Sequence, residues 1–168
     1  MPPSVRKFVL TTHVTSSVGW LGGVATVLAL AVIALTSNDA TVVRACYISM
    51  EMIGWWILVP LSVVSLISGV VQALGSAWGL LRHYWVLVKF VMNVAATGVL
   101  LLYMQTLGYL AALGRDSSLS AVELLSTRDP SPVVHGVAAV ALLLVAVVLS
   151  VYKPRGVTRF AVRRRSPA

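Results

Sequence analysis

Three histidines and one lysine are the reactive side chains that lie inside or beside the apolar segments of this chain. His13 lies in the stretch THVTSSVGWLGGV, which also holds hydroxyl groups, a tryptophan and three glycines. His83 and Lys89 lie together in LLRHYWVLVKF, and His135 follows the residues SPVV. Neutral imidazole is a good ligand for haem iron and for copper. The chemistry that these residues favour is therefore the binding of a cofactor or a metal.

The spacing of these residues places several polar side chains on shared helix faces. His13 and Trp20 are seven residues apart, so a helix brings both to one face. Lys89, Asn93 and Thr97 are spaced at i, i+4 and i+8 and form a single polar stripe. We expect His13 to be an axial haem ligand or a metal ligand, with Trp20 beside the cofactor. Lys89 and Asn93 would lie at the same site, where the lysine neutralises haem propionates.

Each of these residues also has a purely structural interpretation. Lys89 lies early in its segment, so its side chain can extend to the membrane surface without a partner. His83 and His135 lie near the ends of apolar segments, where they fit the aromatic belt of a membrane interface. His13 can hydrogen-bond to a neighbouring helix. A second imidazole, from His83 or His135, would complete the coordination. His135 lies near the opposite side of the membrane from His13, so we do not expect one mononuclear site to contain both.

The composition indicates which elements must position these residues. Of the 168 residues, 58% are hydrophobic and 11% are charged, and the mean hydropathy is +0.91. Soluble domains carry roughly 25% charged residues, so lipid is the main solvent here. A helix needs ~20 apolar residues to cross a bilayer. Four stretches satisfy this: about 8–36, 50–75, 84–109 and 133–152. The sequence predicts an all-α fold, a four-transmembrane-helix bundle forming one membrane domain over residues 1–168.

Local signals modify this outline at three places. Pro60 removes a backbone hydrogen bond from the second span and is expected to kink it. Glu51 lies at the predicted start of that span, where a carboxylate favours the helix dipole. The polar segment 115–130 contains SSLSAVELLS, which predicts a short amphipathic helix outside the membrane.

The distribution of charge predicts the orientation. The basic residues Arg6, Lys7 and Arg82 and the tail 153–168 all lie on one side of the predicted membrane. All five acidic residues lie on the other side: Asp39, Glu51, Asp116, Glu123 and Asp129. Because basic loops stay in the cytoplasm, both termini are expected to be cytoplasmic. The basic tail is expected to lie against anionic lipid headgroups.

Several function classes are not supported by the residues present. The formal charge of +8 comes from the ends of apolar segments, so we do not expect a nucleic-acid partner. The single Cys46 excludes a disulfide within the chain. The sequence has no HExxH motif, no CxxC motif, no phosphate-binding glycine loop and no paired carboxylates within a span. We therefore do not expect a hydrolase or a nucleotide-driven pump.

Three long stretches carry a resemblance. HVTSSVGWLGG, SGVVQALGSAWGLLRHYWVLVKF and SPVVHGVAAVALLLVAVVLSVYKPRG together resemble an uncharacterised family of small predicted bacterial membrane proteins with four helices. This resemblance implies a multi-pass protein of the bacterial cytoplasmic membrane and no particular activity. The first stretch is more distantly similar to the first helix of copper-resistance D type membrane proteins. It is also similar to that of the bacterial membrane protoporphyrinogen oxidase, which implies haem b with His13 and Lys89 at matching positions.

Three functions follow as alternatives. The first is a membrane protein that binds haem b or a metal ion for a redox or a haem- or metal-handling role. The second is a cofactor-free accessory subunit of a larger membrane complex, or a homo-oligomer, in which glycine and serine faces are helix contacts. The third is an oligomeric small transporter, with Lys89, Asn93, Gln72 and Pro60 along its path.

Overall fold

A computed structural model describes residues 1–76, 79–154 and 156–158 of the chain. The helices in chain order are α1 (Pro3–Thr36), α2 (Ala40–Ile53), the π-helical turn η1 (Gly54–Leu58), α3 (Val59–Leu74), α4 (Tyr84–Arg115), α5 (Ala121–Ser126) and α6 (Ser131–Tyr152). The segments α2, η1 and α3 join into one continuous helix, Ala40–Leu74. The described residues thus contain four helices that are long and apolar enough to cross a membrane, which confirms the predicted all-α fold with four long apolar helices.

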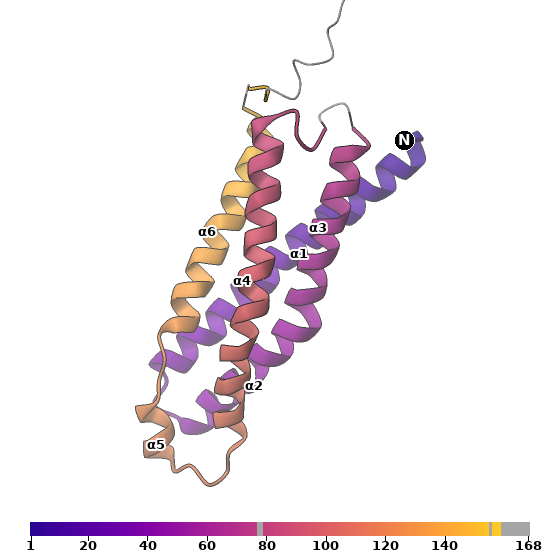
Figure 1. The fold of residues 1–168 in the computed structure, drawn as a ribbon. Helices are drawn as coiled ribbons and strands as arrows, with labels where there is room; N and C mark the ends of the chain where they lie inside the picture. The colour runs from indigo at the N-terminus through magenta and orange to yellow at the C-terminus, as the bar shows by residue number, and fades with distance from the viewer. Residues whose placement is uncertain (77–78, 155, 159–168) are drawn as a thin grey trace, which may run out of the picture.

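The long helices run alternately up and down the bundle (Figure 1). The N-terminus, the α3–α4 link and the last turn of α6 lie together at one end, which we call the terminal end. The α1–α2 link and α5 lie at the opposite end, which we call the loop end. The terminal end therefore gathers the predicted basic side of the protein, and the loop end gathers the acidic side.

All four long helices extend beyond the spans expected from hydropathy, and α6 does so by only two residues. Helix α1 has 34 residues, Ala40–Leu74 has 35 and α4 has 32, whereas α6 has 22. At 1.5 Å per residue, α6 is about 33 Å long and the others are roughly 48–52 Å long. The second helix begins at Ala40 because the Asp39 side chain accepts a hydrogen bond from the backbone N–H of Thr41. Glu51 therefore lies inside α2 and does not start the helix.

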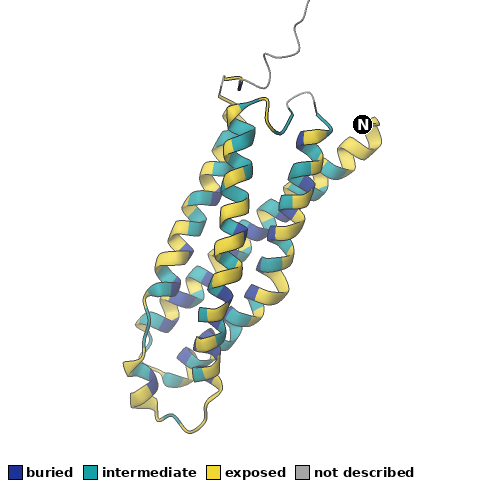
Figure 2. Cartoon of the chain, in the orientation of Figure 1, coloured by how far each residue is buried: buried dark blue, intermediate teal, exposed yellow. Residues whose placement is uncertain are grey.

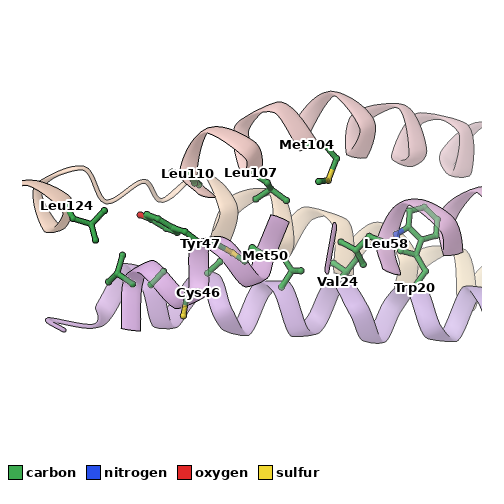
Figure 3. Close-up of a cluster of buried hydrophobic side chains, with 14 of the residues drawn as sticks. Trp20, Val24, Cys46, Tyr47, Met50, Leu58, Met104, Leu107, Leu110 and Leu124 are labelled. Carbon is green, nitrogen blue, oxygen red and sulfur yellow. The ribbon is translucent and has the colours of Figure 1, made fainter. Parts of the chain in front are cut away.

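The tightest packing is at the loop end. The largest fully buried side chains there come from α2, α4 and α5: Tyr47, Met50, Leu107, Leu110 and Leu124 (Figure 3). No residue of 84–96 in α4 or of 144–152 in α6 is buried to the same degree, as the yellow and teal terminal end in Figure 2 shows. The side chains of α4 and α6 are therefore packed in a hydrophobic core at the loop end and are less buried near the termini.

The helix Ala40–Leu74 is distorted where Pro60 was expected to kink it. In η1 the N–H of Val59 bonds to the carbonyl of Gly54, five residues earlier, and Pro60 follows directly. Gly54 also permits a close approach of α4, because a Cβ on Gly54 would lie 2.6 Å from Sδ of Met104. The π-helical turn is thus located where the second span packs most closely on α4.

Arginine side chains cap the C-terminal ends of two helices at the loop end. The guanidinium of Arg44 donates to four backbone carbonyls around the end of α4, at distances of 2.5 to 3.5 Å: Leu113, Gly114, Asp116 and Leu119. The guanidinium of Arg128 donates to the carbonyl of Ser37 and to the side chain of Asn38, just after α1. Both arginines satisfy carbonyl groups that a helix end leaves without an intrahelical partner.

Helix α5 is the short amphipathic helix expected within residues 115–130. Ser120 and Glu123 form a capping box, in which the Ser120 hydroxyl accepts from the Glu123 N–H and the Glu123 carboxylate accepts from the Ser120 N–H. Hydrogen bonds from the Ser120 side chain and backbone hold the pKa of the Glu123 carboxyl below its ordinary value. Leu124 is the fully buried residue of this helix and attaches it to the core.

Candidate functional site

His13 lies on the face of α1 that packs against α3. Its Nδ1 atom lies 3.0 Å from the backbone oxygen of Ser65 and 3.3 Å from Oγ of Ser68. A carbonyl oxygen only accepts, so Nδ1 carries the hydrogen and donates it to Ser65. In neutral His13 the other ring nitrogen, Nε2, is therefore a base with a free lone pair. The ring fits because residue 69 is glycine: a Cβ on Gly69 would lie 3.0 Å from Cε1 of His13.

The stretch around His13 is also a packing surface. Oγ of Ser17 lies 2.8 Å from Oγ of Ser65, which joins α1 and α3 a second time. A Cβ on Gly23 would lie 2.7 Å from Cδ2 of Leu58, so this glycine allows η1 to approach α1 closely. Ser17, Gly19 and Gly23 in THVTSSVGWLGGV thus have structural roles in packing α1 against η1 and α3.

Trp20 fills the core of the bundle. Its side chain is 3% exposed and extends from α1 into the bundle beside Leu58 (Figure 3). Its indole Nε1–H is buried and has no hydrogen-bond partner within the described part of the chain. The ring of Trp20 is therefore packed in the hydrophobic core, while its indole N–H lacks a hydrogen-bond acceptor there.

Asn93 and Thr97, from the polar stripe of α4, face the same interior. Thr97 is 6% exposed, and its Oγ1 atom, like Oδ1 of Asn93, is buried without a hydrogen-bond partner among the described residues. Gly23 of α1 is level with Leu58 of η1, and Gly54 of η1 is level with Met104 of α4. Counting residues along the helices from these two contacts places Trp20 and Thr97 at the same level of the bundle. Three unpartnered polar atoms therefore lie at or near the middle of the bundle.

The stripe ends at Thr97. Farther along α4, toward the loop end, the inward positions are the buried apolar residues Met104, Leu107 and Leu110. The polar interior is thus continuous with the terminal end and is closed off from the loop end by the hydrophobic core.

Substituting Thr97 tests whether this interior is dry. A buried hydroxyl without a partner costs about 1–3 kcal/mol in desolvation, so Thr97→Val should stabilise the ligand-free protein by about 1 kcal/mol. The free energy of unfolding is measured by denaturant titration in detergent micelles. Thr26→Val is the matched control, because the exposed Thr26 hydroxyl already donates to the carbonyl of Gly22. A destabilised Thr97→Val variant would show instead that the hydroxyl has a partner in the folded protein.

Lys89 extends toward α6 and not toward His13. Its Nζ atom donates a hydrogen bond to Oγ of Ser150 and lies 5.9 Å from the centroid of the Trp85 ring. His13 and Lys89 were expected to meet, and the structure brings them within electrostatic range of each other without a hydrogen bond between them. The ammonium reaches the end of the neighbouring helix, which is the behaviour of a lysine that extends toward a membrane surface.

His135 lies at the loop end and is exposed. Its ring stacks on Tyr103 with a centroid distance of 4.1 Å and an angle of 21° between the planes. Its Nδ1 atom lies 2.9 Å from the carbonyl oxygen of Ser131, one turn earlier in α6. These contacts agree with the structural interpretation of His135 as an interface residue.

The three histidines are not gathered in one place. A Cβ on Gly136 would lie 3.0 Å from Leu28 of α1, so His135 is level with a residue 15 positions beyond His13. This corresponds to roughly 22 Å along the helix, and one ion cannot bind both side chains. His83 lies at the terminal end, as the extended residue before α4, where its backbone pairs with Val157.

Metal-ligand clusters are not present in the part of the chain that the structure describes. No group of three or more His, Cys, Asp or Glu side chains gathers there. Glu51 forms an ion pair with Arg115 at the loop end instead. The expectation of His13 as a metal ligand stays a prediction.

Ser150 was not identified by sequence analysis, although it is the partner of Lys89. The signal is weak, because it is only a lone hydroxyl in the apolar run ALLLVAVVLSV. The basic tail that was expected to contact lipid lies largely in residues 159–168, outside the described residues.

Comparison of the chain with protein-family models, with curated proteins and with solved structures finds no match. The function must therefore be inferred from the geometry of the residues themselves.

Proposed function

We propose that this protein is a multi-pass membrane protein that binds haem b through Nε2 of His13. The observation that supports this most directly is the hydrogen bond from Nδ1 of His13 to the Ser65 carbonyl. Histidines that ligate metals usually donate their other ring N–H to a carbonyl or carboxylate, which fixes the tautomer and the ring orientation. His13 has this arrangement, and its ring is held between α1 and Gly69 of α3.

The donor set fits haem better than a free metal ion. Haem iron already has the four nitrogens of its macrocycle and needs one or two axial ligands from the protein. His13 supplies one imidazole, and His83 is the second imidazole at the same end of the bundle. Arg82 is a cation at this end for the propionates. Haem would supply electron transfer or ligand chemistry, while this chain would position it and exclude water.

The orientation that we propose places the terminal end in the cytoplasm of a bacterial cell. Arg6, Lys7, Arg82 and Lys153 lie at that end, and the acidic residues lie at the other. Cytoplasmic loops are enriched in lysine and arginine. Haem bound at His13 would then lie in the cytoplasmic half of the membrane.

An optical spectrum with metal analysis on the same sample tests the proposal. The protein is purified in mild detergent from cells supplied with haem. We expect a Soret band that shifts on dithionite reduction and falls at least tenfold in His13→Ala. His135→Ala is the matched control and should keep the full band, because His135 lies at the loop end. Circular dichroism shows that both variants are folded. A colourless, metal-free and folded wild-type protein would contradict haem binding.

A cofactor-free accessory subunit is the second candidate, and one observation favours it. A Cβ on Gly22 of α1 or on Gly98 of α4 would meet nothing within 4 Å, so these glycines lie on open outer surfaces. Small residues on the outer face of a membrane helix let another helix approach closely. The colourless outcome described above would favour this candidate.

A further inference from the structure

The ammonium of Lys89 lies at the level of a membrane interface. Its hydrogen-bond acceptor, Ser150, is two residues before the end of α6 at Tyr152. Tyr84 and Tyr152 at the same end are 53% and 78% exposed, and Trp85 lies beside the ammonium. Tyrosine and tryptophan concentrate where lipid headgroups meet the hydrocarbon core. The side chain of Lys89 thus starts inside α4 and ends among the residues that mark the headgroup region.

This charge has no acidic partner among the residues that the structure describes. None of the five acidic residues lies at the terminal end; they are Asp39, Glu51, Asp116, Glu123 and Asp129. Ser150 is neutral, and its own hydroxyl donates to the carbonyl of Ala146, so it can only accept from Lys89. A cation next to hydrocarbon needs a counter-charge. His13, which lies within electrostatic range of Lys89, carries no negative charge and cannot supply one.

We propose that Lys89 and Ser150 form a binding site for the phosphate group of an anionic phospholipid on the α4–α6 surface. Ser150 holds the ammonium in position, and the remaining N–H groups of Lys89 donate to phosphate oxygens in charge-assisted hydrogen bonds. Trp85 flanks the site from α4, and Lys153, three residues after Ser150, adds a second positive charge. The proposal rests on α4 and α6 alone and does not depend on haem binding at His13.

The binding of a short-chain phosphatidylglycerol to the full-length protein in neutral detergent micelles tests the proposal. Native mass spectrometry counts the bound lipids during a titration. We expect one tightly bound phosphatidylglycerol per chain and at least tenfold weaker binding in Lys89→Gln. Lys89→Arg keeps the charge and should keep most of the affinity, and Ser150→Ala should weaken binding about threefold. Phosphatidylcholine should bind at least tenfold more weakly than phosphatidylglycerol.

Lys7→Gln is the matched control, because Lys7 is a basic residue of the terminal end on α1, away from the α4–α6 surface. It should bind phosphatidylglycerol like the wild type. Unchanged binding in a folded Lys89→Gln, or an equal loss in Lys7→Gln, would overturn the proposal. Inorganic phosphate at millimolar concentration should leave the lipid bound. Displacement by phosphate alone would assign the site to a soluble phosphate compound and overturn the lipid as its ligand.

Discussion

Replacing Arg44 with alanine is expected to lower the free energy of unfolding by about 3 kcal/mol. The guanidinium donates to four backbone carbonyl oxygens between residues 113 and 119, around the end of α4. A hydrogen bond from a charged group contributes about 1.5–3 kcal/mol, and these bonds share one donor group, so their contributions do not add fully. The variant would leave helix-terminal carbonyls without partners next to the buried core. Denaturant titration in detergent micelles, followed by circular dichroism, measures the loss.

Arg115→Ala is the matched control for this experiment. Arg115 forms an ion pair with Glu51, but its side chain is 50% exposed. Exposed ion pairs contribute about 0–1 kcal/mol, so this variant should be close to the wild type. Arg44→Lys should be intermediate, because an ammonium keeps the charge but cannot contact all four carbonyls in the planar geometry of a guanidinium. Equal losses in Arg44→Ala and Arg115→Ala would show that Arg44 does not close the end of α4.

Replacing Gly114 with leucine is expected to cost about 3 kcal/mol. Even a Cβ at this position would lie 3.0 Å from the backbone oxygen of Arg44, 3.3 Å from Ile48 and 3.4 Å from Tyr47. The nearest of these atoms belongs to the backbone, so it cannot rotate away as a side chain can. Inserting larger groups into a packed core costs about 1–3 kcal/mol or more, and here the insertion also separates α2 from α4.

Gly98→Leu in the same helix is the control, because a Cβ on Gly98 meets nothing within 4 Å. Leucine has a higher helix propensity than glycine, by up to about 1 kcal/mol, so this variant should be as stable as the wild type or slightly more stable. Both variants are compared by thermal and denaturant unfolding in the same detergent. A stable Gly114→Leu would contradict the close approach of α2 and α4 at the loop end.

The four helices were predictable because apolar length is a direct physical requirement for crossing lipid. The start of the second helix was not predictable from hydropathy, because Arg44 and Glu51 make its first three turns appear too polar for a membrane. These turns lie beside α4 and α5, and their contacts with those helices stabilise them: Val43, Tyr47 and Met50 are fully buried there. The packing of these turns against α4 and α5 therefore sets the start of the second helix at Ala40, ten residues before the apolar span.

The candidate site was predictable in part. The helical period correctly places His13 and Trp20 on an inward face, but it does not specify which helix they contact. The hydrogen bond of His13 depends on a glycine at position 69, whose role becomes visible only once α3 lies beside α1. The partner of Lys89 could not be inferred either, because Ser150 is 61 residues away in the chain. Contacts between distant helices leave little trace in a single sequence.

The unequal helix lengths have a consequence for how this protein responds to bilayer thickness. The α6 helix, at about 33 Å, nearly matches a hydrocarbon core of ~30 Å, whereas the other three long helices exceed it by more than a third. Long helices adapt to thickness by tilting, but a helix that just spans the core has little excess to tilt. In a thicker membrane the mismatch would fall on α6, and hence on its contacts with Leu28 of α1 and with Lys89 of α4.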